Sequence, residues 1–373
     1  MTRRLKVVQM VPALDAGGVE TGTLEVGRHL AERGDESVVI SAGGRLQQRL
    51  EAEGSRHVLW PVGRKSLTTL AYIRRLRRFL REERPDILHL RSRVPAWIGW
   101  LAWRGMPENE RPHLVTTVHG FYSVNRYSRI MTRGERVIAV SEGIRDYVLK
   151  NYRGIDPARI RVIPRGVSPE RFPCGFRPDE EWLARWRAEY PGLEGSRVIT
   201  LPARITRWKG ALEFVSLIAR LRREGHEVKG LIVGEPHPRK RQYHEELLRA
   251  RDEAGLGEAI LLPGHRSDLR EIMAISDIVV SLSSDPEAFG RVTLEALSLG
   301  RPVAGFDHGG VGEQLTELLP EGRVPPGDLE AMGRLLGGWL AHGAPAPRRE
   351  NPFTLDRMVS RTREVYLELV DPL

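Results

Sequence analysis

The sequence predicts an α/β protein made of two doubly wound, parallel-sheet domains. The chain of 373 residues is longer than a single core usually supports, so two domains of roughly 150–200 residues are expected. Short β-branched runs alternate with helical stretches on both sides of a proline-rich segment at 168–178. This alternation is typical of parallel sheets covered by helices, which bind ligands beyond the carboxyl ends of their strands.

The first half of the chain alternates strand and helix patterns from its start. Strands are expected at residues 5–11, 37–40, 57–60, 86–90, 114–118, 136–141 and 160–167. Helices are expected at residues 21–33, 45–53, 64–84 and 95–104, and in a stretch that ends near residue 152. Gly17 and Gly18 form the first turn, but their spacing is not G-x-G-x-x-G, so NAD binding is not inferred. Taken alone, they indicate a tight turn.

The second half restarts the same alternation. Strands are expected at residues 197–201, 228–235, 277–282 and 302–306, and in a run that begins at 259. Helices are expected at residues 211–223, 239–250 and 355–369, before residue 276 and after residue 290. Residues 307–313 are expected to form a loop.

Cations are concentrated in the loop between the first strand and the first helix of this half. Arg204 and Lys209 precede a helix whose first N–H groups lack partners within the helix. Together, cations and such N–H groups can hold a diphosphate without a metal. The alternative is a solvated basic loop, and Arg207, in the same loop, has no role that the sequence assigns.

Two carboxylates eight positions apart follow the strand expected at 277–282. Glu287 is expected in a loop and Glu295 on a helix, with Gly290 allowing a ligand to approach the backbone between them. Carboxylates accept hydrogen bonds from sugar hydroxyls and helix N-termini favour phosphate, so the pair suits a nucleotide sugar. The alternative is a first-turn acid that complements the helix dipole and a solvated helix residue.

This stretch resembles the E-x7-E signature of retaining GT-B glycosyltransferases of family 4. It stands here as Glu287-Ala-Phe-Gly-Arg-Val-Thr-Leu-Glu295, followed by Ala-Leu-Ser-Leu-Gly-Arg-Pro-Val. The resemblance covers nearly the whole chain. It implies a GT-B fold of two Rossmann-like domains facing a cleft. The acceptor-binding domain would span 1–170, the nucleotide-sugar domain 171–354, and the C-terminal helix 355–373 would pack back on the first.

The resemblance also implies roles for single residues. Glu287 would contact the hydroxyls of the donor sugar, and Glu295 the ribose of the nucleotide. Arg204 and Lys209 would neutralise the leaving diphosphate, because the family's donor-phosphate motif has cations at these positions. His119 would lie against the donor sugar, whereas on its own it suggests a packed or capping histidine.

Further positions complete the implied site. The donor-nucleotide site would also include Phe289, Gly290 and Arg266. The loop facing the acceptor and the phosphates would contain Gly17, Gly18 and Glu20. Arg165 stands where the family has asparagine in its I-P-N-G-V segment, a departure that leaves the contact made there open.

The implied activity is transfer of a hexosyl unit, with retention, from a nucleotide-diphosphate sugar such as a UDP-sugar. The acceptor would belong to the cell envelope, as lipopolysaccharide core or a lipid-linked glycan does. No D-x-D pair is placed to hold a divalent ion, so no metal or other cofactor is expected. Two alternatives are a nucleotide-sugar 2-epimerase of the same fold and a non-catalytic nucleotide-sugar-binding protein.

Charge and composition limit the partners. A net charge of +9 suits an anionic partner, but no zinc-finger spacing or RNA-binding aromatic signature favours nucleic acid. The helix expected at 64–84 is basic and amphipathic, and Trp97, Trp100 and Trp103 follow it. Both features favour peripheral binding to an anionic membrane, although a core-facing helix with a solvated basic face has the same pattern.

The same composition indicates a compartment. No run approaches the roughly 20 apolar residues that span a bilayer. Cys174 is the single cysteine and fits a reducing compartment. A cytoplasmic location on the inner face of the cytoplasmic membrane is therefore expected.

Overall fold

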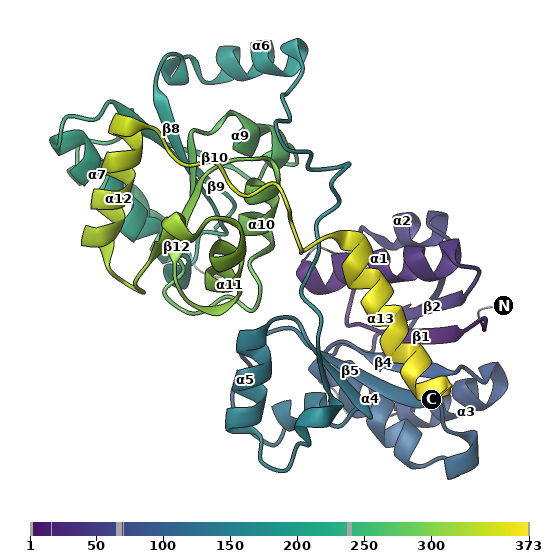
Figure 1. Cartoon of the computed structure of the whole chain (residues 1–373). Coiled ribbons are helices and arrows are strands. Elements are labelled where there is room, and N and C mark those ends of the chain that lie inside the picture. Colours follow the sequence, from purple (N-terminus) through teal and green to yellow (C-terminus); the bar gives the residue numbers. More distant parts are fainter. Residues whose placement is uncertain (1–2, 16, 65–68, 70, 237–240, 372–373) are drawn as a thin grey trace. The chain divides into compact units, whose positions relative to one another are not determined.

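The computed structural model of the protein describes residues 3–371 except 16, 65–68, 70 and 237–240. It separates into two compact units, Met1–Gly166 with Leu355–Leu373 (unit 1) and Val167–Thr354 (unit 2). Each unit contains one parallel sheet with helices packed on it (Figure 1). The α/β fold class expected from the sequence is confirmed.

Unit 1 is built on a seven-stranded sheet in the order β3-β2-β1-β4-β5-β6-β7, with every pairing parallel. The strands are β1 (Lys6–Met10), β2 (Glu36–Ser41), β3 (Arg56–Leu59), β4 (Ile87–Leu90), β5 (His113–Val118), β6 (Arg136–Ala139) and β7 (Ile160–Val162). The central strands are β-branched and buried along almost their whole length, as expected of strands covered on both faces.

The helices of unit 1 are α1 (Gly18–Glu32), α2 (Gln47–Ala52), α3 (Ala71–Glu83), α4 (Arg93–Arg104), α5 (Glu142–Asn151) and α13 (Leu355–Val370). Short 3-10 helices occupy Glu108–Glu110, Ser128–Thr132 and Pro157–Arg159. The helix expected at 64–84 begins at Ala71 in the described part, and residues 65–68 and 70 lie outside it. Its apolar positions Leu76 and Leu80 are fully buried.

The C-terminal helix α13 belongs to unit 1, although the whole of unit 2 precedes it in the chain (Figure 1). It buries Met358, Val359 and Tyr366 in the core that also contains Val7 and Ile87. The Tyr366 hydroxyl lies 2.7 Å from Nδ1 of His89. His89 is a buried residue of β4, the strand that pairs with β1. This helix is therefore part of the core of unit 1.

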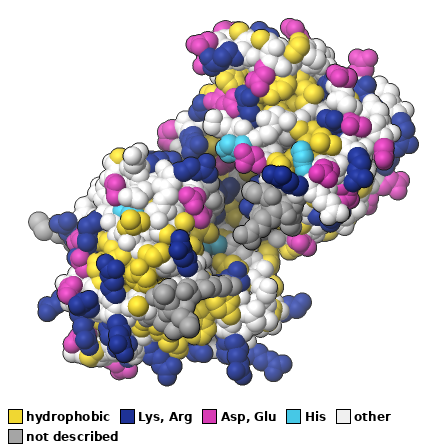
Figure 2. Space-filling model, turned by 180° about the vertical axis from the view of Figure 1, so that it is seen from behind, with side chains coloured by type: hydrophobic (Ala, Val, Ile, Leu, Met, Phe, Trp, Pro, Cys, Tyr) yellow, Lys and Arg dark blue, Asp and Glu magenta, His cyan; other side chains and the backbone are white. Residues whose placement is uncertain are grey.

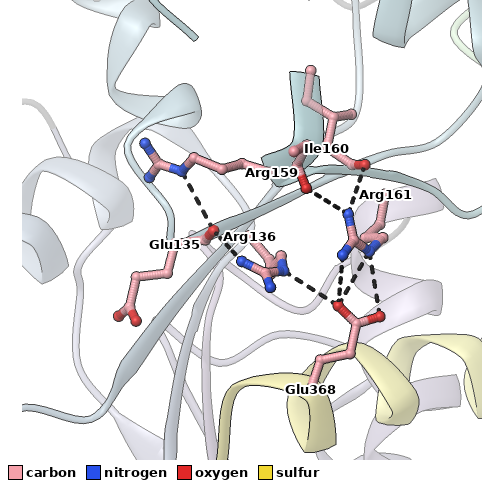
Figure 3. A network of polar contacts seen from close by, with 7 residues as sticks. Glu135, Arg136, Arg159, Ile160, Arg161 and Glu368 are labelled. Carbon is pink, nitrogen blue, oxygen red and sulfur yellow. Dashed lines mark hydrogen bonds and ion pairs between the residues drawn. The ribbon is translucent and has the colours of Figure 1, made fainter. Parts of the chain in front are cut away.

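An exposed ion-pair network also ties α13 to the sheet (Figure 3). The Glu368 carboxylate accepts hydrogen bonds from Arg136 of β6 and Arg161 of β7, at 3.2 and 2.9 Å. The side chains of the network remain one-quarter to two-fifths exposed. Solvent screens such pairs, so burial of the apolar face contributes more to the docking of α13.

Unit 2 is built on a six-stranded parallel sheet in the order β10-β9-β8-β11-β12-β13. The strands are β8 (Arg197–Pro202), β9 (Val228–Val233), β10 (Ile260–Gly264), β11 (Ile278–Ser281), β12 (Val303–Phe306) and β13 (Arg323–Val324). The helices are α6 (Glu180–Glu189), α7 (Ala211–Arg223), α8 (Arg241–Glu253), α9 (Leu269–Ile275), α10 (Arg291–Ser298), α11 (Gly309–Leu318) and α12 (Leu329–His342). The described part of this unit also has 3-10 helices at Pro191–Leu193, Arg207–Lys209 and Pro320–Gly322.

The structure corrects the expected loop at 307–313, because α11 begins at Gly309. Glycines disfavour helix by local propensity, but here they allow close packing. A Cβ on Gly310 would lie 2.3 Å from the Phe289 Cα, and one on Gly312 would lie 2.7 Å from the Asp307 carboxylate. Tertiary contact has overridden the local preference of this segment.

Among the described residues, no helix has both the length and the apolarity that a membrane span requires.

Candidate functional site

The strand order of unit 2 reverses between β8 and β11, so the loops that leave these neighbouring strands diverge. Ligands of doubly wound sheets bind at such a point, beyond the carboxyl ends of the strands. A pocket of about 30 Å³ lies there, lined by residues of β8, β11 and the loops that follow them. It has room for about two water molecules, and Lys209 and Glu287 both line it.

A glycine brings Lys209 to this point. Lys209 ends the 3-10 helix Arg207–Lys209 after β8, and Gly210 follows with φ +78°. A Cβ on Gly210 would lie 2.2 Å from the Leu282 carbonyl oxygen at the end of β11. The Ser284 N–H also donates to the Trp208 carbonyl at 2.8 Å. The two loops therefore touch through their backbones, which leaves Lys209 beside the loop that carries Glu287.

Lys209 and Glu287 form an ion pair, with 2.7 Å between Nζ and Oε1. Their side chains are only 14% and 19% exposed. The Ser283 hydroxyl donates to the same carboxylate oxygen at 2.8 Å, and Nε2 of His308 lies 2.9 Å from the Ser283 carbonyl. The carboxylate is thus held by two donors, and Lys209 also stacks 4.2 Å from the Trp208 ring centroid.

The signature segment frames the other side of the pocket. Gly290, at φ +86°, caps the start of α10 and lines the pocket. Phe289 is buried and packs edge-on against Phe353, so it supports the backbone rather than offering its ring to a ligand. Glu295 follows one turn into α10, where Nε of Arg291 lies 3.9 Å from its carboxylate.

The expected cations of this unit differ in their surroundings. Arg204 is exposed and follows Ala203, which lines the pocket. Within the described part of the chain, its guanidinium has no hydrogen bond or ion pair. Arg207 instead pairs through both terminal nitrogens with Glu246 of α8. Arg266 pairs with Asp268 and Glu189, whose hydrogen bonds raise its pKa. Arg207 and Arg266 therefore serve contacts within the unit.

The remaining expected residues lie in unit 1, around the corresponding reversal between β1 and β4. Gly17 precedes α1 and has φ +145°. A Cβ added at this position would lie 2.5 Å from the Glu20 carboxylate, which folds back over the turn. Gly18 is the exposed first residue of α1. Burial raises the pKa of Glu20.

His119 directly follows β5. Its Nδ1 lies 2.6 Å from a terminal nitrogen of Arg165, which is itself buried. Burial and the adjacent Arg165 hold the pKa of His119 well below its usual range. The expected residues thus form two groups, one in each unit.

Sequence reasoning missed three polar residues at strand ends. Ser283 and His308 hold the Glu287 loop, and Arg91, only 2% exposed, directly follows β4. A serine or histidine after a strand is too common to stand out. An arginine directly after the apolar strand 86–90, beside the reversal of strand order, was the available signal for Arg91.

Comparison with known proteins identifies the family of this chain. The family model described as Glycosyltransferase Family 4 matches residues 16–171, and that described as Glycosyl transferases group 1 matches residues 184–348. A D-inositol 3-phosphate glycosyltransferase from Salinispora tropica is 25% identical, over 95% of this chain and 82% of the relative. A 2-deoxystreptamine N-acetyl-D-glucosaminyltransferase from Streptomyces fradiae is 26% identical, over 86% and 82%.

Solved structures give the same result. The glycosyltransferase from Rickettsia africae superposes with a TM-score of 0.84 at 28% identity, over 99% of this chain and all of the other. Anabaena HepE, solved with UDP and glucose, superposes with a TM-score of 0.77 at 19% identity, over 98% of this chain and 95% of HepE. This likeness shows a shared fold. The chain therefore belongs to the family 4, group 1 glycosyltransferases and has their GT-B fold.

Proposed function

We propose that the protein transfers a hexosyl unit from a UDP-sugar to a cell-envelope acceptor, without a metal and with retention of configuration. The observation that carries this proposal is the Lys209–Glu287 pair at the strand reversal of unit 2. It places a cation and a carboxylate where a doubly wound sheet binds its ligand. The cation suits a diphosphate, and the carboxylate suits sugar hydroxyls.

In this proposal, Lys209 and Arg204 neutralise the charge that grows on the diphosphate as the glycosidic bond breaks. The exposed guanidinium of Arg204 is available for this role, whereas those of Arg207 and Arg266 are engaged elsewhere. When the donor binds, Glu287 gives up its ion pair with Lys209 and accepts hydrogen bonds from hydroxyls of the sugar. The acceptor hydroxyl oxygen bonds to the anomeric carbon on the face from which the diphosphate departs, and an oxygen of the leaving diphosphate takes the hydroxyl proton.

The donor nucleotide is proposed from the structural neighbours. HepE is solved with UDP and with UDP-glucose. An epimerase of the same fold would also bind such a donor but would need no acceptor. A non-catalytic binding protein would release no nucleotide.

The acceptor is proposed from two sources. The neighbour WaaB is described as a lipopolysaccharide outer core galactosyltransferase, which supports an envelope acceptor. Several sequence relatives are D-inositol 3-phosphate glycosyltransferases, so a small phosphorylated cyclitol is the second candidate.

Peripheral membrane binding on the cytoplasmic side is part of the same proposal. The α3 side chains of Arg74, Arg75, Arg78 and Arg81 are exposed, whereas Arg77 packs against Gly105. One face of unit 1 shows many basic side chains among apolar ones (Figure 2). Trp97 and Trp103 each donate an indole hydrogen bond to a backbone carbonyl, so they contribute to packing as well.

A donor and acceptor matrix tests the proposal. The full chain is incubated with UDP-, GDP- and ADP-sugars, alone or with lipopolysaccharide core, a lipid-linked glycan or inositol 3-phosphate, and free nucleotide is measured. We expect acceptor-dependent UDP release that survives excess EDTA. Sugar conversion without UDP release would indicate the epimerase, binding without turnover the binding protein, and loss in EDTA restored by Mg²⁺ or Mn²⁺ a metal-dependent site.

A further inference from the structure

Arg165 contacts His119 through a short hydrogen bond inside unit 1. The distance from Nη2 of Arg165 to Nδ1 of His119 is 2.6 Å. Arg165 lies beyond the end of β7, His119 directly follows β5, and Arg165 is only 6% exposed. From the resemblance to family 4, an asparagine was expected at the position of Arg165, so its contact could not be inferred from the sequence.

The chemistry of the two groups determines which atom carries the imidazole proton. A guanidinium has N–H donors and no acceptor, so Nδ1 of His119 must accept. A neutral imidazole whose Nδ1 accepts carries its single proton on Nε2. Burial, Arg165, Arg91 and His89 all lower the pKa of His119, which keeps the ring neutral near pH 7.

The Nε2 atom of His119 is itself buried and has no hydrogen-bond partner among the described residues. A buried N–H without an acceptor is costly, and an oxygen of a bound molecule would remove that cost. His119 lies at the carboxyl end of the sheet, the edge at which doubly wound folds bind ligands. The ring therefore leaves one buried donor unsatisfied near the edge of the sheet at which a ligand is expected.

The surrounding fold holds the guanidinium in place. Nη1 of Arg165 lies 3.8 Å from the Met358 sulfur of α13. The same nitrogen lies close to Gly22 of α1, where a Cβ would lie 2.5 Å from it. The guanidinium thus lies against both α1 and α13, and a side chain at position 22 would collide with it.

We propose that Arg165 is a positioning residue that fixes His119 as the Nε2–H tautomer, so that His119 donates a hydrogen bond to an oxygen of the bound sugar. This inference rests on the proposed function for the identity of the ligand, but the tautomer itself does not. It assigns a role to the arginine that replaces the family's asparagine. It also predicts that His119 cannot act as a general base through Nε2, because that atom already carries the proton.

The test is nitrogen-15 NMR of the histidine rings in the full chain, with His119 assigned by comparison with His119→Gln. The wild type should show a neutral Nε2–H ring between pH 6.5 and 8. Arg165→Met should give a mixture of tautomers and protonation at higher pH. Arg165→Lys, which keeps a donor, should restore part of the wild-type signal.

A second variant changes the contact without removing the charge. Gly22→Ala lies inside α1, where the helix propensity of alanine by itself favours the substitution. We expect the added methyl group to displace the guanidinium and to alter the His119 signal as Arg165→Met does. The matched control is Arg161→Met, which removes an arginine on β7 that also contacts α13, through Glu368, and should leave the ring unchanged.

Turnover provides the second readout. Arg165→Met and His119→Gln should each lower kcat/KM for the nucleotide sugar by roughly 2- to 13-fold, the usual net effect of one hydrogen bond between neutral groups. A wild-type ring protonated on Nδ1, or a ring unchanged in folded Arg165→Met and Gly22→Ala, would overturn the proposal. A protein that transfers no sugar at all would instead overturn the proposed function, while the NMR result would still decide the role of Arg165.

Discussion

At the scale of single residues, Lys209 has two competing partners. It forms an ion pair with Glu287, and in the proposed function it binds the diphosphate of the donor. Glu287→Gln removes the carboxylate that neutralises Lys209 while keeping a similar shape. We expect UDP to bind at least as tightly as in the wild type, because Lys209 no longer has to leave a carboxylate. We also expect kcat to fall roughly 10- to 150-fold, because the sugar loses a charge-assisted hydrogen bond that strengthens in the transition state. Calorimetry with UDP and steady-state kinetics measure the two effects.

Glu295→Gln is the matched control for that substitution. Its proposed ribose contact is equal in the ground and transition states, so donor affinity should weaken with kcat largely retained. If Glu287→Gln kept full kcat while Glu295→Gln abolished it with UDP affinity intact, the two roles would be wrong.

The buried His89 predicts how stability depends on pH. Burial, followed by Arg91 and Arg165, holds the pKa of His89 well below its usual range, and both ring nitrogens have hydrogen-bond partners. Below about pH 6.5, the unfolded chain binds a proton that the folded chain does not bind. The free energy of unfolding should therefore fall as pH falls, by up to about 1.4 kcal/mol per pH unit for this group, and should not respond to it above pH 6.5.

Urea unfolding at pH 7.5 and 5.5 measures that dependence. His89→Asn should reduce the difference between the two pH values, even though the variant is less stable at both. His342→Asn, at an exposed histidine, is the control and should leave the difference as in the wild type. An unchanged difference in His89→Asn would show that this ring is not the group that titrates.

At the scale of elements, α13 offers a comparison between a buried and an exposed polar contact. Tyr366→Phe removes the hydroxyl that meets His89 in the core and leaves Nδ1 of that ring unpaired. We expect a loss of about 1–3 kcal/mol in the free energy of unfolding. Glu368→Gln, on the same helix, breaks the network of Figure 3 and should cost less than about 1 kcal/mol, because those ion pairs are solvated. The reverse order in urea unfolding would mean that the surface network, not the core, docks α13.

At the scale of the whole molecule, the net charge of +9 predicts binding to anionic surfaces. We expect the protein to sediment with vesicles of phosphatidylglycerol and less as salt rises, since screening shortens to roughly 8 Å near physiological ionic strength. Replacing Arg74 and Arg78 of α3 by glutamine should weaken sedimentation.

The control for the vesicle experiment removes the same charge from unit 2. Arg223 and Arg249 are exposed on α7 and α8, and their replacement by glutamine should have little effect. Equal losses in both double variants would show that total charge, rather than α3, drives the binding.

The sequence alone determined which segments form strands and helices wherever a local pattern was strong. The β-branched runs at 228–235 and 277–282 contain the observed β9 and β11, and the helix expected at 211–223 is α7. Local reasoning works there because side-chain periodicity reports burial directly. The same reasoning wrongly predicted a loop at the glycine-rich start of α11. This part of the helix depends on packing against Phe289 rather than on helix propensity.

Only the tertiary structure decided which polar groups meet. The sequence singled out Lys209, Glu287 and His119 but not the partner of any of them, because partners from different strands are set by sheet order and loop contact. Gly210 against Leu282 brings Lys209 to Glu287, and the space beside Gly22 brings Arg165 to His119. The residue types therefore indicated the chemistry of this protein. Which residues pair depends on close contact between backbone segments far apart in the sequence, and no local sequence pattern predicts such contact.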